Sequence, residues 1–249
     1  MSIRDLKGTV EDRIPIRNVL LSVFYKDGMD NLVLDLFNQT RGYITFISTG
    51  GTYKKLKEIL GTMADTCLIE VAEHTGYPEM EGGLVKTLHP KIHAGLLGER
   101  NNPDHQEYLA KTLDGGVYID LLVGNLYPFE DMVGKIKKGE IDKKTGKPFN
   151  FESARGNIDI GGPAMTRAGA KNFPSCAVLC DPADYEAFLD RVEENDGCTT
   201  FDQRLLLAAK VFRMTANYDT EIADYMENPD LGKGVNSVRD CYVFNEGGD

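Results

Sequence analysis

The feature that most constrains this chain is the alternation of strand-like and helix-like segments over its first two thirds. β-rich apolar runs predict strands at 18–24, 43–48, 119–127 and 176–180. Helical spacing predicts helices at 29–40, 52–60 and 103–113, and an Asp-Pro start signal predicts another helix at 181–194. Because strands that alternate with helices favour parallel pairing, we predict an α/β fold with a mainly parallel sheet and helices on both faces.

The last third of the sequence has a different pattern. Residues 199–228 predict one long helix or two shorter ones with no strand between them, and the tail after them is irregular. The lysine-rich segment 133–150 is weakly apolar and predicts an exposed excursion. We therefore expect a single domain over 1–249, with a core at about 17–195 and a helical extension and tail at about 196–249.

Charge and composition exclude several classes of partner. The 249 residues carry 28 basic and 39 acidic side chains, so the net charge of −11 repels nucleic acid and anionic membranes. No apolar run reaches transmembrane length and the first residues lack a signal-peptide core. Five scattered cysteines without a C-x-x-C pair indicate a reduced, cytoplasmic protein. From the charge we expect no nucleic-acid or membrane partner.

The segment "STGGT" (48–52) follows a predicted strand and opens a predicted helix. Backbone N–H groups at such a helix start favour an anion, and glycines let a ligand approach closely. A plain strand-to-helix turn has a similar sequence, and the segment lacks the lysine of a P-loop.

The segment "GGLVKTLHPKIHAGLL" (82–97) concentrates polar groups with little periodicity. His89 and His93 are four residues apart, but Pro90 argues against a regular helix through both, and no carboxylate or cysteine completes a metal set. We therefore expect no metal. Lys86 and Lys91 are either solvated lysines or, given the glycines and threonine beside them, part of an anion pocket.

Two further segments place polar residues at ends of predicted elements. Asn125 and Tyr127 of "NLYPFE" follow a strong strand, where open parallel sheets collect ligands, although a structural Tyr-Pro turn is the alternative. In "NIDIGGPAMTRAGAKNF" (157–173), Asp159 precedes two glycines and a helix that carries Arg167 and Lys171 on one face. A capped helix with basic residues at its C-terminal end explains that pattern equally.

The distance between the two ends of this helix limits what they can do together. From Pro163 to Lys171 the helix spans roughly 12 Å. Asp159 and Lys171 therefore meet one ligand only if it lies alongside the helix, or else they serve different subunits.

Taken together, these motifs resemble a known family. The segments "STGGT", "TGYPEM", "VKTLHPKIHAGLL", "NLYPF", "NIDIGGPAMTRAGAKNF" and "DPADY" occur in this order in the IMP cyclohydrolase domain of the bifunctional purine-biosynthesis enzyme, which also carries an AICAR transformylase. The resemblance covers about residues 17–228 and implies a methylglyoxal-synthase-like fold and a homodimer. It also implies a stand-alone cyclohydrolase or a piece of a longer chain, with formyl transfer done by a separate upstream formyltransferase.

The implied reaction is closure of the purine ring. FAICAR (5-formamidoimidazole-4-carboxamide ribotide) would give IMP and water, without metal or organic cofactor. The resemblance implies four catalytic residues: Lys86, Tyr127, Asp159 and Lys171. It implies that the nucleotide is bound by Lys26, Thr49, Gly51, Thr52, Thr87, Asn125, Ile160 and Gly161.

The chemistry fits those residue types. The carboxamide nitrogen attacks the neighbouring formyl carbon, so proximity lies within the substrate and no covalent nucleophile is required. Asp159 would accept the amide proton, Lys86 or Lys171 would stabilise the tetrahedral oxyanion, and Tyr127 would relay a proton.

Three departures from the family concern the phosphate. The segment "FYKDG" (24–28) keeps Lys26 and Gly28 of the family pattern but has Phe24 and Asp27 in place of polar groups, and Leu84 replaces an arginine. Arg167, Lys91 or another arginine would have to supply the missing cation. The interval from Tyr127 to Asp159 is also longer than expected.

Two other function classes compete with the cyclohydrolase. One is a nucleotide- or phosphate-sensing regulatory module on the same fold, without catalysis. The other is a lyase such as methylglyoxal synthase, whose small substrate would leave "NLYPF" and "NIDIGG" without use. The presence of all four proposed catalytic residues favours the cyclohydrolase over both.

Overall fold

The structure is a computed structural model that describes residue 6 and residues 9–81 and 84–244. Residue contacts divide the chain into two compact units. The first comprises 1–126 and 160–214, and the second comprises 127–159 and 215–249. Whether the two act as the single domain expected from the sequence stays a prediction. Within the described ranges, no helix is both long and apolar enough to cross a membrane.

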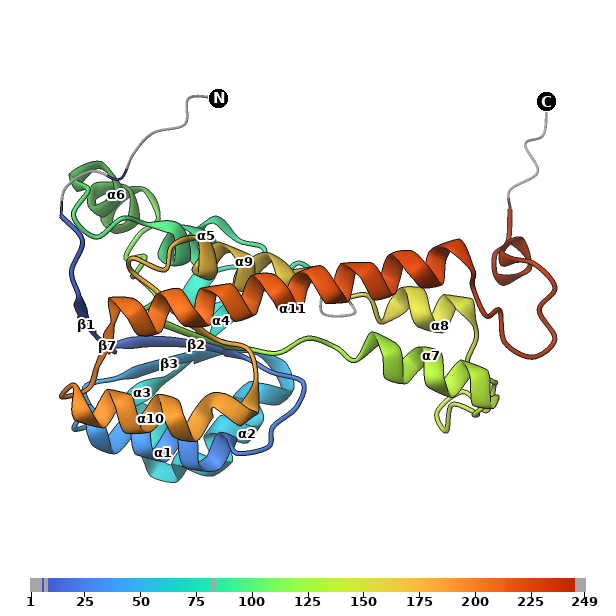
Figure 1. Ribbon diagram of the computed structural model, residues 1–249, viewed down its shortest axis with the longest axis horizontal. Coiled ribbons are helices and arrows are strands. Elements are labelled where there is room, and N and C mark those ends of the chain that lie inside the picture. Colours follow the sequence, from blue (N-terminus) through green and yellow to red (C-terminus); the bar gives the residue numbers. More distant parts are fainter. Residues whose placement is uncertain (1–5, 7–8, 82–83, 245–249) are drawn as a thin grey trace. The chain divides into compact units, whose positions relative to one another are not determined.

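The first unit is built on a five-stranded, fully parallel sheet in the order β4-β3-β2-β5-β6. Figure 1 labels β2 and β3 of this sheet. Its strands are β2 (Asn18–Ser22), β3 (Thr45–Ser48), β4 (Leu68–Glu70), β5 (Leu121–Gly124) and β6 (Ala177–Leu179). The α/β class and the parallel sheet are thereby confirmed. The sequence analysis missed β4, whose three residues are too few to show a pattern.

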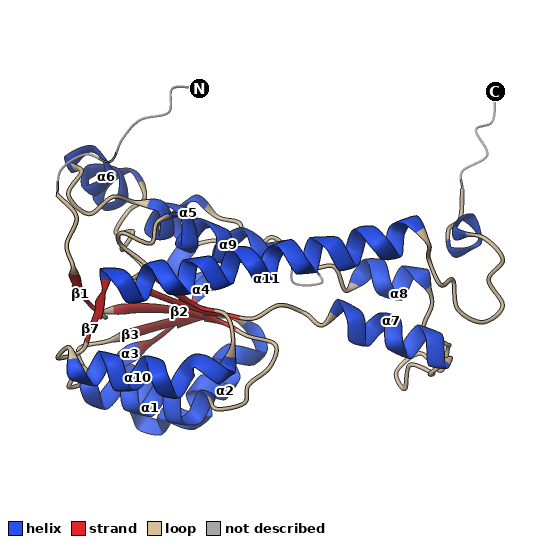
Figure 2. Ribbon diagram, viewed as in Figure 1, coloured by secondary structure: helices blue, strands red, loops and turns tan. Residues whose placement is uncertain are grey.

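Helices cover both faces of the sheet, as Figure 2 shows by its colours. Alternate strand residues enter opposite cores because successive side chains on a strand point to opposite faces. On β2, Val19 and Leu21 pack into one core with α1 (Met29–Gln39), α2 (Gly50–Leu60) and α10 (Tyr185–Glu194). Leu20 packs into the other core with α5 (Pro90–Leu97) and α9 (Gly161–Lys171).

Shorter elements complete the first unit. They are a 3₁₀ turn (Gly61–Met63), α3 (Ala64–Cys67), α4 (Val71–Thr75), α6 (Pro103–Glu107), a π-helical turn (Tyr108–Thr112) and a 3₁₀ turn (Pro182–Asp184). The prediction of a helix at 103–113 is therefore confirmed for most of the segment, which forms α6 and the π-helical turn. The segment predicted at 181–194 starts with the 3₁₀ turn and continues as α10.

A two-stranded antiparallel ribbon joins β1 (Arg13–Pro15) to β7 (Cys198–Thr200), and the long helix α11 (Phe201–Glu227) follows. Residues 201–227 thus form one helix rather than two, and 199–200 lie in a strand. Arg204 is completely buried at this point. Its guanidinium donates to the backbone carbonyls of Glu11, Asp12, Phe173, Pro174 and Thr199, which satisfies a buried charge that pairs with no carboxylate in the described part of the chain.

The second unit consists of α7 (Phe129–Lys138), α8 (Phe151–Gly156), a 3₁₀ turn (Val238–Cys241) and the part of α11 from Thr215 onward. Phe151 stacks on Tyr225 with ring centroids 6.0 Å apart. The prediction of an exposed excursion over 133–150 was wrong for its first part, because residues to Lys138 belong to α7 and Ile136 is 2% exposed. The amphipathic pattern of this helix was not recognised from the sequence, because it has few apolar residues among its lysines.

Candidate functional site

The polar residues expected at strand ends lie at one edge of the sheet in the first unit. Leu21 of β2 pairs with Ser48 of β3 and with Val123 of β5, so the segments that follow these three strands leave the sheet side by side. In an open parallel sheet this carboxyl edge is where ligands bind. The segments after β2, β3 and β5 contain most of the predicted nucleotide contacts.

The glycine turn after β3 begins α2 two residues earlier than predicted. Thr49 is the N-cap, and Gly50 has φ +57°, a conformation that favours glycine. No acceptor among the described residues bonds to the N–H groups of Gly50 and Gly51. The turn therefore presents open N–H groups at a helix N-terminus, as expected for an anion site.

Asn125 and Thr52 hold the segment that follows β2. The Asn125 Oδ1 accepts from the N–H groups of Phe24 at 2.7 Å and Tyr25 at 2.9 Å, and its Nδ2 donates to the Tyr25 carbonyl at 3.0 Å. The Thr52 hydroxyl donates to the Val23 carbonyl at 3.0 Å. Both residues were predicted as nucleotide contacts, and in this structure their side chains shape the wall of the edge.

Lys86 lies against the glycine turn. A Cβ at Gly50 would be 3.3 Å from the Lys86 Nζ, so the ammonium group lies close to the glycine turn. The Lys86 Nζ forms an ion pair of 2.8 Å with the Glu79 Oε2. The glycine turn and Lys86 of the "VKT" segment therefore lie side by side, and their role as one site stays a prediction.

Glu79 is a site residue that the sequence analysis missed. Its Oε1 accepts from the Thr49 hydroxyl at 2.5 Å, so one carboxylate joins two predicted site residues. Partial burial opposes ionisation, but the hydrogen bonds from Lys86 and Thr49 outweigh it and lower the pKa of Glu79. The only signal in the sequence was its place in the motif "TGYPEM".

Thr87 lies beside the start of α9. A Cβ at Gly161 would be 3.1 Å from the Thr87 Oγ1, and the preceding Ile160 is 65% exposed. Pro163 is the third residue of α9 rather than the first. It still lies in the first turn, where backbone N–H groups have no acceptor within the helix, so proline is tolerated there. Thr87, Ile160 and Gly161 are thus brought together.

Lys171 lies at the other end of the same helix. Ten residues separate it from Gly161, which corresponds to about 15 Å along the helix axis. It is exposed. The next residue, Asn172, is the C-cap of α9, and its side-chain amide donates to the carbonyls of Leu96 and Gly98 at the end of α5. Of the two arrangements left open, a site shared between subunits fits this separation, and it stays a prediction.

Tyr127 and Asp159 belong to the second unit. Tyr127 is 51% exposed just before α7. The backbone N–H of Asp159 donates to the Tyr218 hydroxyl at 2.8 Å. Tyr218 is buried, and burial is the main reason why its pKa is raised. Tyr218 was not expected from the sequence, because it lies 59 residues further along the chain.

The residues that depart from the family pattern are exposed at the same edge of the first unit. Phe24 is 43% and Leu84 61% exposed, whereas the Lys26 Nζ donates to the Phe24 carbonyl at 3.2 Å. The two proposed substitutes for the missing arginine have contacts elsewhere. Lys91 donates to the Asp114 carbonyl at 2.9 Å, and Arg167 lies over the Phe212 ring at 5.5 Å.

The two histidines lie at the start of α5 and within it. His89 is the N-cap of α5, and its Nδ1 accepts from the Lys91 N–H at 3.1 Å. Burial lowers the pKa of His93, and burial with the charge of Lys91 lowers that of His89, so both are neutral at pH 7. Across the described ranges no three His, Cys, Asp or Glu side chains are grouped to hold a metal. Gly82 and Gly83 lie outside the described residues.

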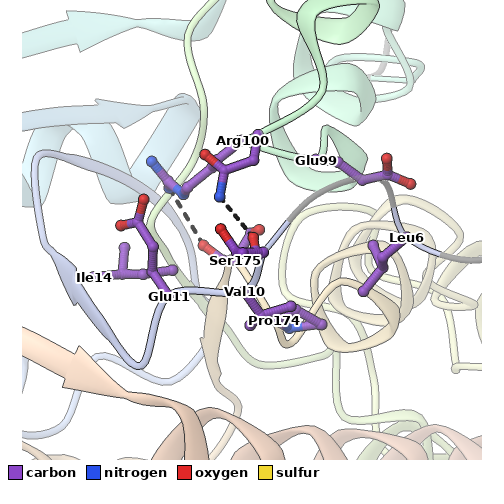
Figure 3. A pocket seen from close by; sticks show the side chains of 10 residues that line it. Leu6, Val10, Glu11, Ile14, Glu99, Arg100, Pro174 and Ser175 are labelled. Carbon is purple, nitrogen blue, oxygen red and sulfur yellow. Dashed lines mark hydrogen bonds between the residues drawn. The ribbon is translucent and has the colours of Figure 1, made fainter.

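Two hollows lie at the opposite, amino edge of the sheet. One is a cavity of about 20 Å³ lined by Glu11, Arg100 and Ser175 among others, where Arg100 donates to the Ser175 carbonyl at 3.3 Å (Figure 3). It has room for about one water molecule. The other is an open hollow of about 490 Å³ beside Arg17 and Tyr43. Neither is lined by a predicted site residue.

The parallel sheet, the open helix N-terminus and the lysine beside it define an α/β protein whose strand ends carry groups that suit an anionic ligand. Sequence comparison narrows the class. The model of the AICARFT/IMPCHase bienzyme family matches residues 169–243.

Individual relatives match most of the chain. It is 42% identical over 212 residues to the bifunctional purine biosynthesis protein PurH of Chlorobium phaeobacteroides (strain BS1), which covers 85% of this chain and 36% of the relative. It is 42% identical over 223 residues to PurH of Chlorobaculum parvum, which covers 90% and 39%. The crystal structure of ForH matches at 29% identity with a TM-score of 0.64, over 85% of this chain and 99% of ForH.

The chain is thus similar to the AICARFT/IMPCHase bienzyme family in residues 169–243, and to PurH proteins over 85–90% of its own length. It spans well under half the length of the curated relatives that it matches.

Proposed function

We propose that this chain is an IMP cyclohydrolase that closes the purine ring of FAICAR to give IMP and water, the last step of purine biosynthesis. The observation that carries the proposal is the contact of Lys86 with the glycine turn, in a chain 42% identical to bifunctional purine biosynthesis proteins. A cation beside open helical N–H groups suits an anionic nucleotide.

In the proposed reaction the carboxamide nitrogen of FAICAR bonds to its own formyl carbon, and the former formyl oxygen leaves as water with two protons, one from the carboxamide nitrogen and one from the formamide nitrogen. Asp159 accepts the proton that the amide nitrogen loses. Lys86 or Lys171 stabilises the tetrahedral oxyanion, a contribution of about 3–4 kcal/mol for one well-placed donor. Tyr127 relays a proton to the departing oxygen. No metal or organic cofactor takes part.

We assign the following roles to the eight residues proposed to contact the nucleotide. Thr49, Gly51 and Thr52 present the helix N-terminus, Asn125 keeps the segment with Lys26 in place, and Thr87, Ile160 and Gly161 form the opposite wall of the edge. The open N–H group of Gly51 and the three hydrogen bonds of Asn125 support these roles.

Beyond the reaction, we propose a cytoplasmic homodimer supplied with FAICAR by a separate formyltransferase. The separation of Lys171 from the start of α9 supports a site shared by two subunits, because one subunit's α9 presents its two ends about 15 Å apart.

Parallel assays with two substrates test the proposal. FAICAR alone is expected to be converted to IMP, whereas AICAR with a formyl-group donor is expected to remain unchanged. Formylation of AICAR without ring closure would replace the proposal with a transformylase. Binding of IMP without either reaction would favour the nucleotide-sensing module.

A further inference from the structure

The carboxylate of Glu79 occupies the anion-binding end of α2. Its Oε2 pairs with the Lys86 Nζ at 2.8 Å, and its Oε1 accepts from the Thr49 hydroxyl at 2.5 Å. Thr49 is the N-cap of α2, and its side chain makes no hydrogen bond to the helix backbone. The Thr49 hydroxyl and the Lys86 ammonium therefore both bind the Glu79 carboxylate.

An anionic ligand at this end of α2 would need both the Thr49 hydroxyl and the Lys86 ammonium as donors. The Thr49 hydroxyl has one hydrogen to donate and cannot give it to Glu79 and to a ligand oxygen at once. The Lys86 ammonium beside Gly50 is the cation nearest to the open N–H groups among the contacts described above. A phosphate bound here would also lie within a few ångströms of the Glu79 charge, where like charges repel.

We propose that Glu79 is a positioning residue that acts as an exchangeable counter-ion. In the empty site it holds Lys86 and Thr49 in place, and the phosphate of the ligand takes over both partners when it binds. The identity of the ligand as a nucleotide rests on the proposed function, but the exchange itself requires only a phosphate group.

Inorganic phosphate tests the exchange directly. The dissociation constant is measured by calorimetry for wild type, Glu79→Gln and Glu81→Gln. Glu81 is the matched control, since it is exposed and lies two residues away, and its substitution changes the net charge equally. Glu79→Gln is expected to bind phosphate about tenfold more tightly, which corresponds to 1.4 kcal/mol, and Glu81→Gln within about twofold of wild type.

Equal or weaker phosphate binding by Glu79→Gln would overturn the proposal. A purely structural role of Glu79 could only weaken binding, so tightening separates the two explanations. Glu79→Ala, which also removes the charge, is expected to shift binding in the same direction.

Kinetics give a second readout. With FAICAR as substrate, KM is expected to fall in Glu79→Gln relative to wild type and Glu81→Gln, and an unchanged or higher KM contradicts the exchange. If wild type does not convert FAICAR, the proposed function fails, while the phosphate titration still decides the role of Glu79.

Discussion

Replacing Asn125 with alanine removes three hydrogen bonds that hold the segment after β2. Two N–H groups, those of Phe24 and Tyr25, lose their acceptor, and the Tyr25 carbonyl loses its donor. Each neutral hydrogen bond contributes about 1 kcal/mol net, which gives about 3 kcal/mol for the set. Since Phe24 and Tyr25 are partly exposed and water replaces some of these bonds, we expect a loss of about 2–3 kcal/mol.

Urea unfolding measures this loss. For a slope of about 2–3 kcal/mol/M, the midpoint is expected to fall by about 1 M. Asn101→Ala is the control, because its exposed amide makes one bond, to the Thr9 carbonyl at 2.6 Å. The control is expected to lose at most about 1 kcal/mol. If Asn125→Ala loses no more than the control, the three bonds do not hold the segment and the reasoning is refuted.

Three further changes test other parts of the structure. Tyr218→Phe removes the acceptor of the Asp159 N–H and is expected to cost about 1 kcal/mol in urea unfolding and to lower kcat more than it changes KM; equal kcat would argue against a positioning role. Burial, with the charges of Lys91 and His89, lowers the pKa of His74 to about 4, so the unfolded chain binds a proton that the folded chain does not. Stability is therefore expected to fall by about 2–3 kcal/mol from pH 6.5 to pH 4, and less in His74→Phe; identical pH profiles would contradict this. Arg204→Met leaves buried carbonyls without a donor and is expected to lower the free energy of unfolding by more than about 3 kcal/mol. A smaller loss in thermal unfolding would show that the hydrogen bonds of Arg204 are dispensable.

The sequence predicted those parts of the fold and site that depend on local pattern. The strand at 43–48 and the glycine turn after it are contiguous, so periodicity and glycines sufficed to predict a strand followed by a helix start there. Asn125 followed from its position after a buried strand. The strand order and the two cores could not be predicted in the same way, because they depend on packing between distant segments.

The residues that were missed act across long stretches of chain. Glu79 contacts Thr49, which is 30 residues away, and Tyr218 contacts Asp159, which is 59 residues away. The sequence around Glu79 or Tyr218 contains no pattern that would identify the residue it contacts. The helical start of the lysine-rich segment was missed because Phe129, Met132 and Ile136 are too few to outweigh its charges.

The measurement that tests the central claim most directly is the conversion of FAICAR to IMP, followed by ultraviolet absorbance with the product identified by mass. Wild type is expected to convert FAICAR, and Lys86→Ala and Asp159→Ala are each expected to lose at least about 100-fold in kcat, as removal of an oxyanion donor or a general base does elsewhere. Conversion that persists in both variants, or none in wild type, would contradict the account.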